Sequence, residues 1–154
     1  MDEEPWRIAM IARDVGLTAV QLHGDETPED AASLSPIPWY KAFRVSQGFR
    51  PEILGLYPCT TYLLDAWRPE GGATERFDWR KARGLSLYGK IVIAGGLDPE
   101  NVEEAIAEAR PYGVDVASGV EFAAGKKDLD RVEAFVRAAR RAQERIAGEG
   151  ENPA

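Results

Sequence analysis

The chain has 154 residues, of which 44% are hydrophobic and 29% charged, the balance of an ordinary soluble globular domain. Its formal net charge of −7 argues against a nucleic-acid or membrane-surface partner, although a few local backbone N–H groups can still hold a small anion. No apolar run approaches the ~20 residues that span a membrane, and the acidic N-terminus lacks the basic start of a signal peptide. The single cysteine, Cys59, excludes an intrachain disulfide and favours a cytoplasmic location.

Short apolar runs alternate with longer amphipathic stretches along the chain. The apolar runs predict parallel strands covered on both faces, and they are Ala19–Leu22, Trp39–Phe43, Thr61–Leu64, Ile91–Ala94 and Val114–Ala117. The apolar spacing between them predicts clear helices around 8–15, 102–109 and 132–139, and weaker ones at 28–34, 51–57 and 78–87. Asp98 is expected to be the N-cap of the helix that contains Val102, with Pro99 in its first turn.

This order, one helix and then five strand–helix units, predicts an α/β fold with a parallel sheet and right-handed crossovers. No linker interrupts it, so we expect one domain over 1–145 and a flexible polar tail over 146–154. The strand spacing suits either a doubly wound sheet or a barrel.

Glycines and one serine follow the last two predicted strands. Gly95-Gly96 and Ser118-Gly119 would expose backbone N–H groups at the same sheet edge, as a phosphate site requires. Asp98 would repel a phosphate at the following helix terminus, so we expect the anion on the loop amides and near Ser118. Either pair alone is more simply explained as a tight turn, but their occurrence in successive units favours binding.

Three ionisable residues are candidates for the same edge. Asp65 closes an apolar run and is placed to act as a general acid, although a helix cap or a surface turn would explain it nearly as well. His23, the only histidine, ends a strand beside Gly24, whereas a lone histidine is more often structural. Asp115 is expected inside the last strand, where a buried carboxylate needs a partner, so it is structural or substrate-facing.

Metal and nucleotide motifs are not found. One histidine and one cysteine, without a close second ligand, make no metal signature. Neither a Walker loop nor a G-x-G-x-x-G pattern occurs.

Six segments follow the order and spacing of one enzyme family. They are Val20–Glu26, Lys41–Phe43, Leu63–Asp65, Phe77–Trp79, Ala94–Val102 and Val114–Glu121, the last followed by Gly125–Asp128. Over about residues 2–140 the chain resembles phosphoribosylanthranilate isomerase. The glycine-pair motif alone is weak evidence, but six segments in register are specific.

The resemblance implies a barrel enzyme of tryptophan biosynthesis that needs no cofactor and takes a small phosphosugar substrate through an Amadori rearrangement. It assigns Asp65 as the acid that protonates the ribose ring oxygen. The residues that it assigns to the phosphate grip and the lining of the pocket are His23, Gly95, Gly96, Asp115, Ser118 and Gly119.

The chain departs from the family in two places. The family's first strand ends in Lys-Ile-Cys-Gly, whose cysteine is the general base, and this motif is not in the sequence. We therefore expect a partial (β/α)8 TIM barrel that holds strands four to eight, starts at a misread initiation site and is inactive alone. Cys59 precedes the strand that ends at Asp65, so it should lie at the far end and pack as a core residue. The loop Gly71–Arg76 also lacks a family glycine.

Two other interpretations remain open. The chain can be a non-catalytic phosphosugar-binding fragment that needs a partner chain, because open strand edges recruit partners, including a second copy. A different phosphate-binding barrel enzyme, such as indole-glycerol-phosphate synthase, fits less well, because its catalytic lysines and glutamate are not in evidence.

Overall fold

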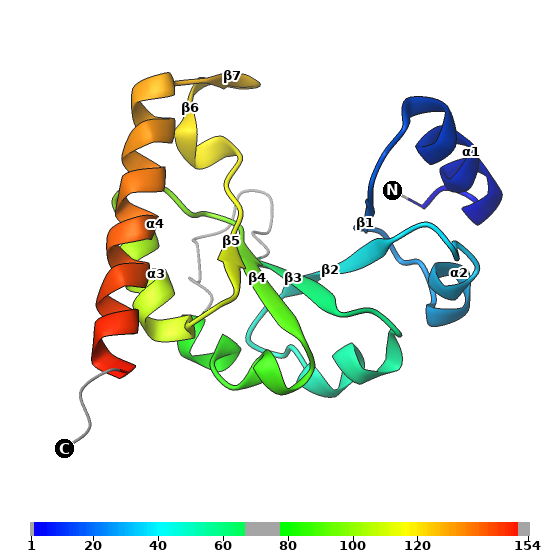
Figure 1. The fold of residues 1–154 in the computed structure, drawn as a ribbon, viewed down its shortest axis with the longest axis horizontal. Coiled ribbons are helices and arrows are strands. Elements are labelled where there is room, and N and C mark those ends of the chain that lie inside the picture. The colour runs from blue at the N-terminus through cyan, green and yellow to red at the C-terminus, as the bar shows by residue number, and fades with distance from the viewer. Residues whose placement is uncertain (1, 67–77, 151–154) are drawn as a thin grey trace.

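A parallel five-stranded sheet forms the centre of the molecule. The computed structural model describes residues 2–66 and 78–150. The strands lie side by side in chain order (Figure 1), and they are β1 (Val20–Leu22), β2 (Trp39–Val45), β3 (Thr61–Ala66), β4 (Lys90–Ala94) and β5 (Gly113–Val114). The predicted α/β class and the five predicted strands are thus confirmed. β1 and β5 form the two edges of this sheet.

β5 is shorter than predicted. It ends at Val114, because the chain turns away from the sheet into the 3-10 helix η4 (Ser118–Val120). The N–H of Asp115 still donates to the carbonyl of Ile93 at 2.9 Å, so the ladder fades over one further residue. The expectation that Asp115 lies inside the strand is therefore wrong.

The helices surround the sheet largely as the apolar spacing predicts. α1 (Pro5–Val15) ends at Gly16, whose left-handed φ of 73° lets its N–H cap the last turn. α2 (Pro28–Ala32) opens with a capping box between Thr27 and Asp30. The other two α-helices are α3 (Val102–Ala109) and α4 (Leu129–Gly150).

Of the three weaker predicted helices, the one at 28–34 is the α-helix α2, and the other two are 3-10 turns. The one at 51–57 is η1 (Pro51–Leu56), and the one at 78–87 is divided into η2 (Trp79–Ala82) and η3 (Leu85–Leu87). The loop at 71–76 and Phe77 lie outside the described residues. α4 continues through Gly150, so the residues from 146 to 150 are helical, and flexibility of the remaining tail stays a prediction.

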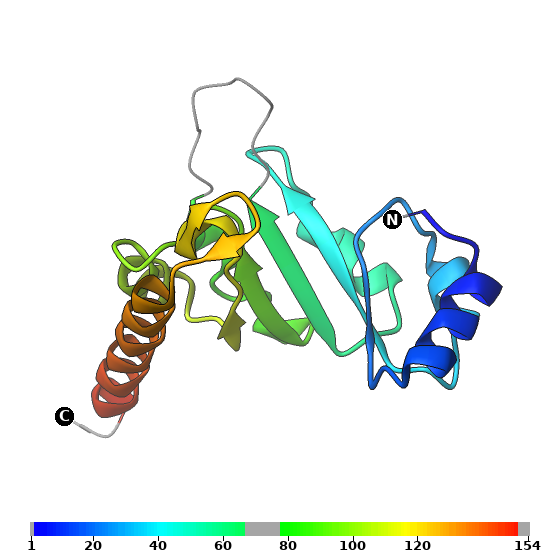
Figure 2. The same cartoon turned by 90° about the horizontal axis from the view of Figure 1, so that it is seen from above.

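One small element was not predicted. β6 (Glu121–Ala123) and β7 (Lys126–Lys127) form an antiparallel hairpin between η4 and α4. Gly125, at φ 72°, makes its turn. α1 and α4 lie at opposite ends of the molecule (Figure 2).

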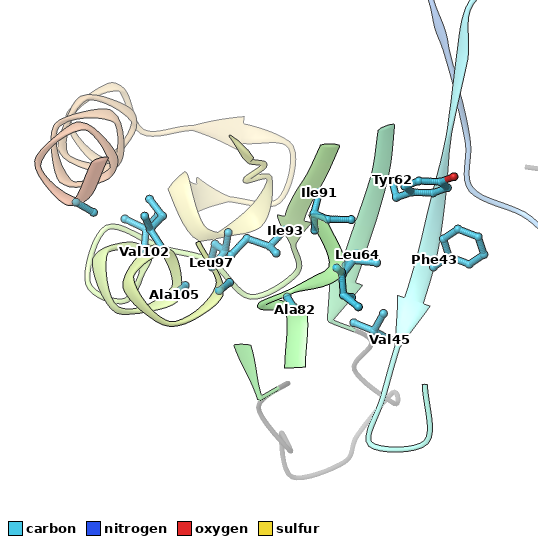
Figure 3. Packing of buried hydrophobic residues seen from close by; sticks show 14 of the residues in the cluster. Phe43, Val45, Tyr62, Leu64, Ala82, Ile91, Ile93, Leu97, Val102 and Ala105 are labelled. Carbon is cyan, nitrogen blue, oxygen red and sulfur yellow. The ribbon is translucent and has the colours of Figure 1, made fainter. Parts of the chain in front are cut away.

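The main core lies on one face of the sheet. Phe43, Leu64 and Ile93 are in register on adjacent strands and are buried with residues of α3 and α4. Figure 3 shows Leu64 and Ile93 on this side, with Val102 on the neighbouring helix. The other face carries a smaller cluster, of which the buried members are Ala42, Leu63 and Ala94. Because side chains alternate along a strand, Asp65 lies on this second face.

Candidate active site

Asp65 and His23 come together at the carboxyl edge of the sheet. Asp65 is the penultimate residue of β3, and His23 directly follows β1. His23 Nε2 lies 3.3 Å from Asp65 Oδ2, and both side chains are about 30% exposed, at 27% and 31%. The nitrogen is buried but is not aligned for a hydrogen bond, so the two side chains are close without being bonded. Two predicted site residues from strands distant in sequence therefore face each other.

Neighbouring amide and hydroxyl groups assign the proton of the His23 ring. Tyr40 Oη donates to Gln21 Oε1 at 2.9 Å, which leaves the amide nitrogen of Gln21 as the donor. That nitrogen lies 3.2 Å from His23 Nδ1, which must then accept. A neutral His23 consequently carries its hydrogen on Nε2, the atom that faces Asp65.

Gly95 packs directly against the Asp65 carboxylate. Its φ is +83°, and a Cβ there would overlap Asp65 Oδ1 and approach the Ala66 nitrogen to 2.6 Å. Only glycine fits both the backbone conformation and the space. Gly96, at φ 68°, follows, and its carbonyl accepts from Asn101 Nδ2 at 2.9 Å. The first glycine of this pair thus supports the Asp65 carboxylate, a role that its sequence position did not indicate.

Asp98 does not cap α3. Its Oδ1 accepts from the N–H groups of Glu100 and Asn101, at 3.0 Å and 2.8 Å, and α3 begins only at Val102 with Asn101 at the N-cap. The predicted cap is therefore wrong. An aspartate satisfies its own turn as readily as a helix terminus, and here the local turn comes first.

Ser118 and Gly119 lie in η4, beside the loop that follows β4. A Cβ on Gly119 would overlap the carbonyl oxygen of Leu97, so the two loops touch through their backbones. Arg131 links them a second time, because Nε donates to the Gly119 carbonyl at 3.1 Å while the guanidinium binds both carboxylate oxygens of Glu100, at 3.1 Å and 2.8 Å. The two predicted phosphate loops are thus neighbours.

Asp115 is not buried as predicted, and its role as a substrate-facing residue stays a prediction. Its side chain is exposed and follows the end of β5, so it is not a buried carboxylate in need of a partner. The valines on both sides suggested a strand interior, but the chain leaves the sheet before Asp115 becomes covered.

Cys59 lies at the opposite end of β3 from Asp65, as predicted. It precedes Thr61, the first residue of the strand, and its thiol donates to the Thr61 carbonyl at 3.4 Å. The side chain is half-buried against the main core, and burial raises the pKa of the thiol. This environment stabilises the protonated thiol, so Cys59 is not a base for chemistry at Asp65.

Two charged residues beside the site were missed. Lys41 and Glu26 are the buried polar side chains of the described core, and their charged atoms lie 3.1 Å apart. A cavity of about 290 Å³ opens beside His23, Gly24, Lys41 and Tyr57. A lysine within the apolar run of β2 was the available sequence signal, since an unpaired lysine is rarely buried.

The described residues form neither a metal site nor a membrane span. Within 2–66 and 78–150, no three His, Cys, Asp or Glu side chains gather in a way that could hold a metal ion. Among the described helices, none combines the length and the apolar character needed to cross a bilayer.

Comparison with known proteins identifies the family. The profile described as N-(5'phosphoribosyl)anthranilate (PRA) isomerase matches residues 1–138. The chain belongs to this family. A PRA isomerase of Geobacter sp. strain M21 is 47% identical over 128 residues, which cover 82% of this chain but 62% of that protein. The chain therefore spans less than two thirds of the length of this curated relative.

Solved PRA isomerases share the fold. The Thermotoga maritima protein is 40% identical, with a TM-score of 0.81, and the match covers 91% of this chain and 70% of that one. A second structure, 37% identical with a TM-score of 0.77, covers 90% of this chain and 68% of that one. Its title describes a complex with reduced 1-(o-carboxyphenylamino)-1-deoxyribulose 5-phosphate. The predicted family is confirmed.

Proposed function

We propose that this chain supplies the acid and the phosphate-binding loops of a PRA isomerase site. The reaction is the Amadori rearrangement of N-(5'-phosphoribosyl)anthranilate to 1-(2-carboxyphenylamino)-1-deoxyribulose 5-phosphate, in tryptophan biosynthesis. The observation that carries the proposal is the contact between Asp65 and His23 at the carboxyl edge of the sheet. In α/β barrels this edge is where catalytic groups gather.

Asp65 is the proposed general acid. It gives a proton to the ribose ring oxygen as the bond from C1' to that oxygen breaks, and the nitrogen lone pair forms the iminium. A base then takes the proton from C2', and the resulting enol becomes the ketone of the product. His23, with Nε2–H toward Asp65, stabilises the carboxylate that remains once this proton has been transferred.

The phosphate is proposed to bind at the two joined loops. Gly95 and Gly96 have left-handed φ values, which turn successive backbone N–H groups to one side. Ser118 is exposed and adds a hydroxyl beside Gly119. Asp98 is engaged by its own turn amides, which reduces the repulsion that its charge would exert.

We further propose that the 154-residue chain turns substrate over at background rate and corresponds to strands four to eight of the family's barrel. Its single cysteine is remote from Asp65, and the base that the family resemblance assigns is not in the sequence. Adding the segment that relatives carry before this region, from the upstream reading frame or as a separate chain, should restore turnover.

The alternative is a non-catalytic phosphosugar-binding domain completed by a partner. The two sheet edges at β1 and β5 favour it, since each offers backbone groups to another strand, including one from a second copy. Sedimentation analysis and a urea denaturation curve test this alternative. A chain that stays monomeric at all concentrations and unfolds cooperatively would exclude a required partner.

Calorimetric titration with the reduced deoxyribulose 5-phosphate compound tests the binding half of the proposal. The wild-type chain and Asp65→Asn should both bind, whereas Ser118→Asp should bind at least about tenfold more weakly because it adds a like charge. Ser86→Asp, at an exposed serine in η3, is the matched control and should bind as wild type. No binding by the wild type would reject the proposal for this chain.

The chemical half is tested in the extended or complemented protein. Asp65→Asn should lower turnover by about 10²–10⁴-fold, because an amide cannot deliver the proton. Unchanged turnover would assign the acid to another residue.

A further inference from the structure

Lys41 and Glu26 form an ion pair that is removed from solvent. Their side chains are 4% and 7% exposed, and Lys41 Nζ lies 3.1 Å from Glu26 Oε2. The ammonium also lies 5.5 Å from the centre of the Phe43 ring and 5.9 Å from that of Tyr57. A buried pair of this kind is commonly no more stabilising than apolar residues of the same volume. Fold stability alone therefore does not explain why charges occupy this position.

Both members of the pair bind Gly24, while Lys41 Nζ also donates to the Ala42 carbonyl at 3.3 Å. Lys41 Nζ donates to the Gly24 carbonyl at 2.7 Å. The Glu26 carboxylate accepts from the Gly24 N–H at 3.0 Å and 3.2 Å. Both backbone polar groups of this glycine are thus bound to buried charges, and charge-assisted hydrogen bonds are the stronger kind.

Glu26 is itself held in place. Tyr57, which follows η1, donates its hydroxyl to the Glu26 carbonyl at 2.9 Å. Desolvation is the main cause that raises the pKa of this phenol, and the Glu26 carboxylate adds to it. Tyr57 therefore stays a hydrogen-bond donor over the neutral pH range, and the loop after β1 is anchored to β2 and to η1 together.

Gly24 directly follows His23, so hydrogen bonds that fix the Gly24 peptide groups also fix the backbone position from which the His23 side chain extends. The ring meets Asp65 at 3.3 Å without an aligned hydrogen bond, so this contact does little to hold the ring by itself. We propose that Lys41 and Glu26 are positioning residues that hold His23 against Asp65 through Gly24. This assignment rests on the proposed function for the importance of Asp65, but the geometry that it predicts can be measured without turnover.

The sole histidine makes the test direct. In a ¹H–¹³C spectrum of the full chain, the imidazole Cε1–H signal can come only from His23. Asp65→Asn should move this signal in the wild-type background, because the two side chains are in contact. In the background Lys41→Met with Glu26→Gln, which removes both charges and keeps the side-chain volumes, most of that movement should disappear. Such a double-mutant cycle isolates the coupling.

Control variants separate positioning from general loosening. Arg141→Met removes an ion pair to Glu103 between α4 and α3, far from β1, and should leave the response to Asp65→Asn unchanged. Lys41→Arg, made with Glu26 unchanged, keeps a cation and its hydrogen-bond donors. Its response to Asp65→Asn should be larger than that of the doubly substituted chain. If the doubly substituted chain does not fold by circular dichroism, Glu26→Asp serves, because it keeps the charge balance but shortens the side chain that binds the Gly24 N–H, and it should reduce the response.

An equal response to Asp65→Asn with and without the buried pair would overturn the proposal. So would an Arg141→Met background that reduces the response as much as loss of the pair. Failure to bind the reduced deoxyribulose 5-phosphate compound would reject the proposed function and leave this result intact, so the two failures can be told apart.

Discussion

The loop after β1 and the loops after β4 and β5 lie at the same edge of the sheet but are fixed in different ways. The first is held by the buried charges of Lys41 and Glu26, which bind Gly24. The others are held by backbone contact, where Gly95 and Gly119 leave no room for a Cβ. The difference follows the role proposed for each loop: the first presents a side chain, His23, while the others are proposed to bind phosphate through backbone N–H groups. Four changes break or sharpen this comparison, from the largest expected effect on stability to the smallest.

Removing one buried charge should cost most. Lys41→Met leaves the Glu26 carboxylate buried without its cation, and we expect a loss of about 3–5 kcal/mol in the free energy of unfolding. Urea denaturation at neutral pH measures it. The double change with Glu26→Gln should recover most of the loss. A double variant no more stable than the single one would show that the hydrogen bonds to Gly24, and not the charge balance, dominate.

Tyr62, near the amino end of β3, should make the free energy of unfolding depend on pH. Desolvation first, and then the neighbouring Cys59, raise the pKa of Tyr62 to about 12. The unfolded chain releases this proton near pH 10, before the folded chain does. The contribution of Tyr62 to the free energy of unfolding is therefore fully present below that pH. It should fall by roughly 2–3 kcal/mol as the pH rises to about 12. Urea denaturation across this range measures the fall, which Tyr62→Phe should reduce; an unaltered fall would assign it to other groups.

A methyl group at Gly119 tests the backbone contact. Gly119→Ala places Cβ on the Leu97 carbonyl, and the required shift of two loops should cost about 1–3 kcal/mol. The same change at Gly48, where nothing lies within 4 Å of the added carbon, is the control and should stay within about 0.5 kcal/mol. Thermal unfolding compares the two; equal effects would mean that the loops are not held by close approach.

The Arg131–Glu100 pair should matter least for stability. Its side chains are 37% and 65% exposed, so water and salt screen the charges. Arg131→Met should change the free energy of unfolding by less than about 1 kcal/mol. Urea denaturation in low and high salt checks this value. A larger loss would show that the loops after β4 and β5 depend on side-chain charges after all, as the loop after β1 does.

Much of the fold was predictable because strands covered on both faces leave a continuous apolar run. The end of β5 was not, since Val116 continues the apolar pattern although the chain has already left the sheet. The weaker helix predicted at 51–57 is a 3-10 turn for a related reason: Pro51 fixes its start, but Leu54 is its one buried residue, so little apolar packing extends the element.

The site was predictable in its location and less so in its supports. Asp65 and His23 could be placed at one edge because parallel strands all end on the same side. The contacts of Lys41 with Gly24 and Glu26 could not, since they depend on how a loop folds back over the neighbouring strand. Asp98 does not cap α3, because its carboxylate accepts from the N–H groups two and three residues later, in the turn that precedes the helix.

The order of strands in the sheet is also the order in the chain, and this has a consequence for how the molecule forms. Every strand pairs with the next one to be synthesised, so no segment must wait for a distant partner. Short sequence separation between contacting residues favours rapid folding. The two longest ladders, β2–β3 and β3–β4, have five residue pairs each and share β3, so the centre of the sheet can form before its two edges.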